Sequence, residues 1–213
     1  MDFAEFVLSQ LPPRPLRVLE VGCGEEGGVV PTLAAAGHDV LGVDPDAPKG
    51  RRYRRVTLEE LDEPGPFDAV VAGRVLHHVR ALQPALAKLA ALAPLLVLDE
   101  FAWNHIDGPT VRWYENRHRR LVAAGREPKG PPDIDEWRRK HSDLHPYETL
   151  RQELDARYTE RYSEWRPYFY RWLGDPETEE EERSLIAAGA IRPIGFRYSG
   201  VARDAGVAGD PDA

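Results

Sequence analysis

Residues 18–28 read VLEVGCGEEGG, an apolar stretch that runs into a glycine-rich loop. The glycines fit the spacing G-x-G-x-x-G, which lets a tight turn bring backbone N–H groups close to a bound ligand. Glu20 stands two positions before the first glycine, and two further acids lie within the loop. Carboxylates beside the loop oppose the binding of two phosphates. These acids therefore disfavour a dinucleotide as the ligand of the loop and favour a ligand with positive charge.

S-adenosylmethionine is such a ligand, because its sulfonium and α-amino groups are positive and it has no phosphate. We expect Glu20 to accept a hydrogen bond from the amino group, directly or through water. Gly22 and Gly24 would let the backbone approach the methionine part. Asp44 follows the next apolar stretch and would hold the ribose hydroxyls. That role suits a nicotinamide cofactor equally, so Asp44 does not discriminate between the two.

The elements that must position these residues alternate along the first half of the chain. A helix is expected through Ala36, closed by Gly37, and another over 74–92, where leucines recur at helical spacing. This alternation, with continuous apolar strands, indicates an α/β fold with a doubly wound, mostly parallel sheet. The expected strands cover residues 16–21, 39–43, 53–56, 67–72 and 95–98.

After Phe101 the composition changes, and residues 103–173 contain all five tryptophans and most of the tyrosines. We expect a single domain over 1–203, with a helical, aromatic-rich insertion at about 103–156 that contributes to the substrate site. The aromatic side chains could roof that site or form core between helices and sheet. Residues 204–213 are expected to be a disordered tail. Helices are expected over 111–124, 135–141, 146–156 and 178–188, and strands over 157–165 and 192–203.

Four segments, in order, resemble the class I S-adenosylmethionine-dependent methyltransferases. Residues 20–24 (EVGCG) resemble their first motif, an acid followed by G-x-G, and 42–45 (GVDP) resemble their ribose motif. Residues 67–79 and 92–100 are similar to their fourth- and fifth-strand segments. The resemblance implies S-adenosylmethionine as cofactor, methyl transfer as the reaction, and a reversed C-terminal strand in the sheet. The cofactor-binding residues that it implies are Glu20, Gly22, Cys23, Gly24, Asp44, Pro45, Leu58, Ala72 and Gly73.

The chain departs from that family pattern at two places. Glu26 stands where the family has a third glycine, so we expect a turn that is one residue longer. The acid that often follows the third strand is absent from 57–59. We therefore expect adenine to be held by a backbone contact near Leu58.

Two histidines, His77 and His78, follow the fourth expected strand. In this architecture the cofactor and the acceptor meet there, so either histidine could act as a general base. A base is needed only if the acceptor must lose a proton, because alignment alone accounts for much of a methyl transfer. One histidine packed at the start of the helix and the other solvated is the structural alternative.

Three other features have ordinary structural explanations. Asp99, Glu100, His105 and Asp107 could bind a divalent ion, but they lack a dedicated metal-ligand spacing, so no metal site is expected. Cys23 is expected to be a small side chain beneath the loop rather than a nucleophile. The arginines of 51–55 could meet an acidic partner, although such runs more often form a solvated face.

Composition narrows the class of partner. The chain has 213 residues, one cysteine and a formal net charge of −8. The negative charge disfavours nucleic acid as a partner, and no apolar run is long enough to span a membrane. A single cysteine agrees with a reducing compartment. We therefore expect a cytoplasmic enzyme that methylates a small molecule.

Two alternatives stay open. One is an NAD(P)-dependent oxidoreductase that uses the glycine loop for pyrophosphate, against which the charge of Glu20 argues. The other is a non-catalytic protein that binds S-adenosylmethionine or S-adenosylhomocysteine as a sensor or scaffold.

Overall fold

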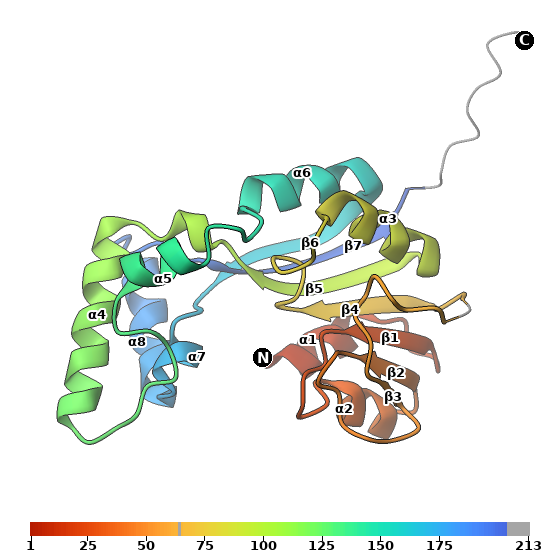
Figure 1. The fold of residues 1–213 in the computed structure, drawn as a ribbon, viewed down its shortest axis with the longest axis horizontal. Coiled ribbons are helices and arrows are strands. Elements are labelled where there is room, and N and C mark those ends of the chain that lie inside the picture. Colours follow the sequence, from red (N-terminus) through yellow and green to blue (C-terminus); the bar gives the residue numbers. More distant parts are fainter. Residues whose placement is uncertain (64, 204–213) are drawn as a thin grey trace, which may run out of the picture. The chain divides into compact units, whose positions relative to one another are not determined.

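The computed structural model describes residues 1–63 and 65–203, so the expected disordered tail at 204–213 lies outside the described residues. Within the described residues, seven strands form one sheet in the order β3-β2-β1-β4-β5-β7-β6 (Figure 1). Parallel pairing joins β3 to β2, β2 to β1, β1 to β4 and β4 to β5. The strands are β1 (Arg17–Val21), β2 (Asp39–Val43), β3 (Tyr53–Arg54), β4 (Ala69–Gly73), β5 (Leu95–Phe101), β6 (Tyr158–Arg166) and β7 (Gly195–Ala202).

The final strand runs against its neighbour. The N–H of Ala202 donates to the carbonyl of Pro94, and the N–H of Ala102 donates to the carbonyl of Ile194, both at 2.7 Å. These bonds join the end of β7 to the start of β5 and the start of β7 to the end of β5, which makes the pair antiparallel. The doubly wound, mostly parallel sheet with one reversed C-terminal strand is thereby confirmed.

The expected helices are present, although one begins later than expected, and the short helix at 170–173 was not expected. The helix expected over 74–92 begins only at Leu82, so that prediction is wrong for its first part. Arg74 has a φ of 56°, a left-handed conformation, and its N–H donates to the carbonyl of Asp99 at 2.7 Å. The backbone therefore follows β5 at this point instead of winding into a helix. The helices are α1 (Phe3–Gln10), α2 (Val30–Ala35), α3 (Leu82–Leu92), α4 (Gly108–Ala123), α5 (Ile134–Lys140), α6 (Tyr147–Arg157), α7 (Tyr170–Leu173) and α8 (Pro176–Ala187), with a 3-10 turn η1 (Trp103–His105).

The chain divides into two compact units. Unit 1 contains residues 1–99, 150–163 and the described chain from Tyr198, and unit 2 contains 100–149 and 164–197. The aromatic-rich segment expected at 103–156 is therefore shared between the units, and unit 2 also takes in 164–197. The contribution of that segment to a substrate site stays a prediction.

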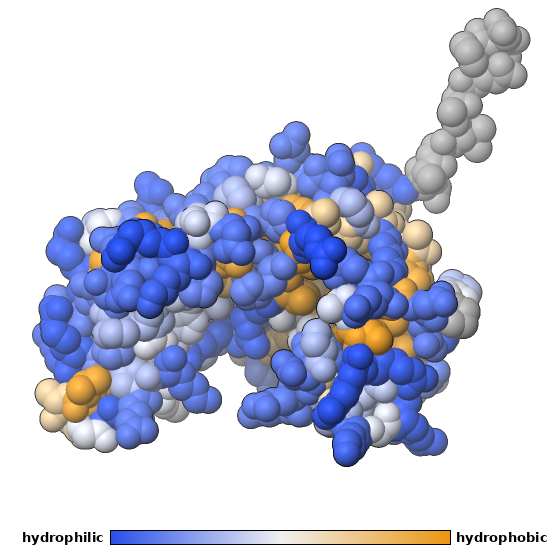
Figure 2. Space-filling view, in the orientation of Figure 1, coloured by the Kyte–Doolittle hydropathy of each residue, from blue (hydrophilic) through white to orange (hydrophobic). Residues whose placement is uncertain are grey.

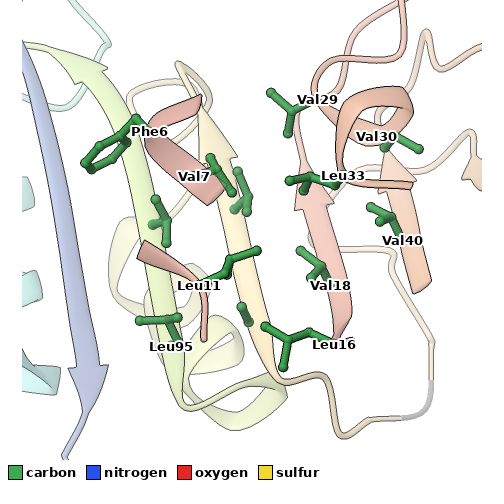
Figure 3. Close-up of a cluster of buried hydrophobic side chains, with 13 residues drawn as sticks. Phe6, Val7, Leu11, Leu16, Val18, Val29, Val30, Leu33, Val40 and Leu95 are labelled. Carbon is green, nitrogen blue, oxygen red and sulfur yellow. The ribbon is translucent and has the colours of Figure 1, made fainter. Parts of the chain in front are cut away.

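Part of the core of unit 1 lies between α2 and the first strands of the sheet. Val18 on β1 and Val40 on β2 point toward the side of the sheet that α2 covers, and Leu33 of α2 is fully buried among them (Figure 3). Since side chains alternate along a strand, Glu20 faces the same side as Val18. The first part of the sheet thus directs one carboxylate toward the start of α2.

Aromatic side chains form the core of unit 2. Phe101 stacks on Tyr168 with ring centroids 4.4 Å apart, and Phe169 lies 4.8 Å from Tyr114. Partly buried tryptophans pack around these rings, including Trp172. The aromatic residues therefore provide the packing of this unit, in line with the core alternative.

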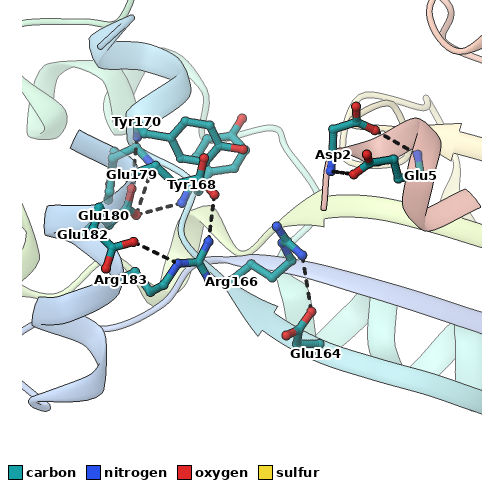
Figure 4. Close-up of polar contacts among 11 residues, drawn as sticks. Asp2, Glu5, Glu164, Arg166, Tyr168, Tyr170, Glu179, Glu180, Glu182 and Arg183 are labelled. Carbon is teal, nitrogen blue, oxygen red and sulfur yellow. Dashed lines mark hydrogen bonds and ion pairs between the residues drawn. The ribbon is translucent and has the colours of Figure 1, made fainter. Parts of the chain in front are cut away.

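A buried acid organises the same unit. Glu182 of α8 is fully buried, and its carboxylate accepts hydrogen bonds from the N–H groups of Tyr168, Phe169 and Tyr170 at 2.7–3.1 Å (Figure 4). These are N–H groups at the start of α7, which have no partner within the helix itself. The short helix α7 is thus fixed to α8 through one side chain.

Figure 2 shows a mostly hydrophilic face on which apolar side chains gather in several small patches, one of them at the C-terminal end of α4, where Val122 is 53% exposed. Within the described ranges, no helix combines the length and the apolar character that crossing a membrane requires.

The N-terminal helix offers a test of local stability. Asp2 Oδ1 accepts the N–H of Glu5, and Glu5 Oε2 accepts the N–H of Asp2, each at 2.8 Å (Figure 4). This capping box satisfies two N–H groups at the start of α1. Asp2→Ala should therefore lower the free energy of unfolding by about 1 kcal/mol in urea titration. Asp2→Ser, which keeps an acceptor, should lose less, and equal stability of D2A and the parent would contradict the role of the cap.

Candidate functional site

A cavity of about 230 Å³ opens in unit 1 beyond the carboxyl ends of the parallel strands. The chain passes from β1 to β2 on one side and later reaches β4 on the other side of β1. Ligands of open α/β sheets bind outside the strand ends at such a reversal of strand order. The lining residues are Val21, Gly22, Val43, Asp44, Pro45, Val56, Thr57, Leu58, Glu59, Val75, His78 and Val79.

Gly22 of the glycine loop lines this cavity, whereas Cys23 and Gly24 do not. Gly22 has a φ of 80°, and a Cβ there would lie 2.7 Å from the Cβ of Val75. Its N–H donates to the carbonyl of Val43 at 2.8 Å, which ties the loop to the end of β2. Gly24 has a φ of 62° and no atom within 4 Å of its Cβ position. Both positions require glycine, the first for close packing and both for a left-handed backbone.

Glu20 does not line the cavity. Its side chain is 2% exposed, and its carboxylate accepts the N–H of Val29 at 2.9 and 3.0 Å and the N–H of Val30 at 3.0 Å. A Cβ on Gly28 would overlap the carboxylate, so glycine is needed there as well. Burial raises the pKa of Glu20 to about 7, against the lowering effect of the two N–H groups and of Arg74.

These contacts give Glu20 a structural role. The carboxylate of Glu20 accepts N–H groups at the start of α2, where the N–H groups of the first turn stabilise an anion. Its charge is accounted for without a cationic ligand. A contact of Glu20 with a cofactor stays a prediction.

Three other expected residues do lie at the cavity. Asp44 directly follows β2, and its Oδ1 accepts the N–H of Asp46 at 2.8 Å, which fixes the turn. Pro45 and Leu58 line the same cavity from neighbouring loops. Leu58 is buried, as a side chain under a bound ring would be. The sequence pattern therefore located three residues at this cavity, and their contact with a cofactor stays a prediction.

Ala72 and Gly73 lie at the end of β4 and do not line the cavity. Ala72 is fully buried within the sheet. A Cβ on Gly73 would lie 3.0 Å from a ring carbon of Phe3, so this part of the strand end is covered by α1. Arg74 next to it forms a 3.6 Å ion pair with Asp99 of β5.

The two histidines differ in their surroundings. His78 is exposed and lines the cavity, whereas His77 is 5% exposed. Their rings lie 4.1 Å apart between centroids. The arrangement leaves His78 as the histidine that a ligand in the cavity can reach.

Cys23 lies beneath the loop, as expected for a structural residue. It is buried, and its Sγ would lie 3.1 Å from a Cβ on Gly42. Burial raises the pKa of the thiol to about 12, with the charges of Glu20 and Asp44 adding to the effect. A thiol with this pKa is protonated at neutral pH and is a poor nucleophile.

The acids and histidine of 99–107 serve separate contacts. Asp99 pairs with Arg74, His105 Nε2 lies 2.6 Å from Glu148 Oε1, and Asp107 accepts the N–H of Thr110 at 3.0 Å. Among the residues that the structure describes, no three His, Cys, Asp or Glu side chains come together as a metal site would require.

Val75 and Val79 line the cavity from the turn after β4, within the segment 67–79 that resembles the fourth-strand segment of the family. Thr57 and Glu59 follow β3 and carry no motif signal. Their only sequence signal is position, since each comes soon after an apolar strand and thus near the carboxyl edge of the sheet.

Comparison with known proteins bears on what binds in this cavity. A ubiquinone biosynthesis O-methyltransferase of Rhodopseudomonas palustris (strain TIE-1) is 33% identical over 90 residues, which cover 36% of this chain and 35% of that protein. The corresponding protein of Bradyrhizobium diazoefficiens is 37% identical over 90 residues, with the same coverage. The match thus spans about a third of the length of these curated relatives.

Solved structures share the fold over nearly the whole chain. A S-adenosylmethionine-dependent methyltransferase from Mesorhizobium loti has a TM-score of 0.58 at 19% identity, covering 94% of this chain and 98% of that one. The 1,6-didemethyltoxoflavin-N1-methyltransferase of Burkholderia thailandensis, solved with 1,6-didemethyltoxoflavin and S-adenosylhomocysteine bound, has the same TM-score and identity and covers 94% and 77%. The methyltransferase domain family matches residues 2–162. The chain therefore belongs to the methyltransferase domain family, as its resemblance to the class I S-adenosylmethionine-dependent enzymes indicated.

Proposed function

We propose that this protein transfers a methyl group from S-adenosylmethionine to a small-molecule acceptor. The observation that carries the proposal is the cavity beside Gly22 and Asp44, at the strand-order reversal of a chain that belongs to the methyltransferase domain family. Its volume of about 230 Å³ is below the roughly 300–1,000 Å³ of most ligand pockets. It suits the nucleoside part of the cofactor.

The lining residues support specific roles. Asp44 would accept hydrogen bonds from the ribose hydroxyls, through the oxygen that does not hold the turn. Pro45, Val56 and Leu58 give apolar contact for the adenine ring. The loop from Gly22 to Gly24 would hold the methionine part through its backbone, with Ala72 and Gly73 at the end of β4 beyond it.

Methyl transfer needs few catalytic side chains. The sulfonium already activates the methyl carbon, so the protein contributes mainly by aligning acceptor and donor. Where the acceptor must lose a proton, His78 is the group at the cavity that would take it, and His77 would position it through ring contact.

The acceptor is proposed to be a small molecule. The net charge of −8 opposes contact with a nucleic-acid backbone. The Burkholderia thailandensis neighbour is a methyltransferase solved with a small heterocyclic molecule bound. A cytoplasmic location stays a prediction, which the single cysteine supports.

Isothermal titration with S-adenosylmethionine tests cofactor binding. We expect saturable binding to the full chain and competition by S-adenosylhomocysteine. Absence of heat at millimolar ligand, with binding of NADH instead, would support the oxidoreductase alternative and overturn the proposal.

Turnover separates an enzyme from a passive binder. Labelled methyl groups from S-adenosylmethionine should appear in a product when the protein is incubated with a metabolite extract. Binding without product above the no-protein background would favour the sensor or scaffold alternative.

Replacement of Asp44 tests the ribose contact. Asp44→Asn keeps the oxygen that accepts the Asp46 N–H but removes the charge, so the turn should survive. We expect affinity for S-adenosylmethionine to fall about 10- to 100-fold in titration calorimetry, the loss of a hydrogen bond to a charged group. Asp46→Asn removes the same charge two residues away and outside the cavity lining. Equal affinities of the two variants would contradict the assignment.

A further inference from the structure

A second cavity in unit 1 lies away from the proposed cofactor site. It measures about 260 Å³ and shares no lining residue with the first cavity. Arg17 and Asp39, which begin β1 and β2, line it, whereas Gly22 and Asp44 follow the ends of the same strands. The complete lining is Arg17, Asp39, Val40, Leu41, Arg51, Arg52, Arg54, Glu63 and Phe67.

The alternation of side chains explains why arginines gather there. Tyr53 packs toward the α2 side, since a Cβ on Gly42 would lie 3.0 Å from its ring. Its neighbours Arg52 and Arg54 therefore face the other side of the sheet. Val40 also faces α2, which puts Asp39 and Leu41 on the arginine side.

The described residues between β3 and β4 provide no helix to cover this part of the sheet. A crossover from β3 to β4 would normally carry one. Here the described residues between the two strands, 55–63 and 65–68, form turns and loops. The side chains of the arginines thus border an open cavity instead of a packed layer.

The cavity has an excess of positive charge that its own acids do not neutralise. Four arginines face two carboxylates, in a chain whose net charge is −8. Glu63 lies 3.7 Å from an Nη of Arg17 and 3.9 Å from Nε of Arg54, both longer than a hydrogen bond. The Arg17 guanidinium lies over the Phe67 ring at 4.4 Å.

Two of these arginines have donors to offer a ligand. Nε of Arg52 is buried with no hydrogen-bond acceptor in the described chain. A buried donor without an acceptor destabilises the structure by about 1–3 kcal/mol. No side-chain hydrogen bond or ion pair of Arg51 is found among the described residues either. An anion seated in the cavity would supply the acceptors that the protein lacks.

We propose that this cavity binds a small molecule with a phosphate or diphosphate group. Guanidinium groups present paired N–H donors that match the oxygens of a phosphate, and several of them around one cavity favour multiple negative charges. The apolar wall formed by Leu41 and Phe67 leaves room for an uncharged part of the ligand. The site is independent of the proposed methyl transfer, because it uses none of the residues of the first cavity.

Sodium pyrophosphate is the probe for this site. We expect saturable 1:1 binding to the full chain in titration calorimetry at low salt, weakening as sodium chloride is added. Saturating S-adenosylhomocysteine should leave this binding unchanged. Absence of saturable heat, or displacement of pyrophosphate by S-adenosylhomocysteine, would overturn the proposal. Tighter binding of a short oligonucleotide than of pyrophosphate would also overturn it, in favour of a nucleic-acid surface.

Charge variants locate the binding. Arg52→Gln and, separately, Arg51→Gln should weaken pyrophosphate binding by about tenfold or more, since each removes a charge-assisted contact. Glu63→Gln should strengthen it several-fold, because it removes a carboxylate from the same cavity. Arg183→Gln is the matched control, as Arg183 is half exposed on α8 and pairs with Glu179. Equal weakening in the control and in R51Q and R52Q would show non-specific attraction and would contradict the site.

Discussion

Gly28→Ala should lower the free energy of unfolding by about 3–5 kcal/mol, although the change adds one methyl group. Gly28 has a φ of 55°, and its Cβ position overlaps the carboxylate of Glu20. The left-handed backbone alone costs an alanine about 1 kcal/mol. The larger cost arises because the buried carboxylate must leave the N–H groups of Val29 and Val30. Val30 keeps a second acceptor, the carbonyl of Gly27 at 3.3 Å. The carboxylate and the Val29 N–H lose these partners, and each buried group left unpaired costs about 1–3 kcal/mol.

Gly24→Ala separates the two costs. Gly24 has a φ of 62°, close to that of Gly28, but its Cβ position has no neighbour within 4 Å. Urea unfolding without ligand should therefore show a loss of only about 1 kcal/mol for G24A. Equal losses in G24A and G28A would mean that the contact with Glu20 contributes nothing.

The same loop shows what could be predicted from the sequence. The glycines and Asp44 are local signals, and they located the turn and the end of β2 correctly. The partner of Glu20 could not be found in this way. Its carboxylate binds N–H groups nine and ten positions later, and that contact depends on how α2 packs over β1. An acid before a glycine loop is consistent with a ligand contact and equally with a helix cap.

The helix predicted at 74–81 from helical spacing is wrong for a related reason. Leu76 and Val79 are buried, so the apolar residues of this pattern do face the core. The conformation of Arg74 and its bond to Asp99 nevertheless turn the chain along β5. Tertiary contacts of this kind override a local period. They also place Val75 at the wall of the cavity.

A second large effect should appear as a dependence of stability on pH. Burial raises the pKa of both Glu20 and Glu182 from 4.5 to about 7, with backbone N–H groups opposing the shift. Between those pH values the folded protein binds protons that the unfolded chain has released. The stability from these groups is therefore fully present below about pH 4.5, falls as pH rises through 7, and is constant above. Each carboxyl accounts for at most about 3 kcal/mol of this fall.

Urea titrations at pH 5 and pH 8 measure the dependence. Glu20→Gln and Glu182→Gln each remove one titrating group, so each variant should lose less stability between the two pH values than the parent does. The Gln side chains can be less stable at every pH, because an amide offers one acceptor oxygen where the carboxylate offered two. The difference between pH values, not the absolute stability, identifies the carboxyl. Asp2→Asn at the exposed cap of α1 is the control, and it should leave that difference unchanged. An undiminished fall in both glutamine variants would place the proton uptake elsewhere, and would mean that the N–H groups around each carboxylate outweigh its burial.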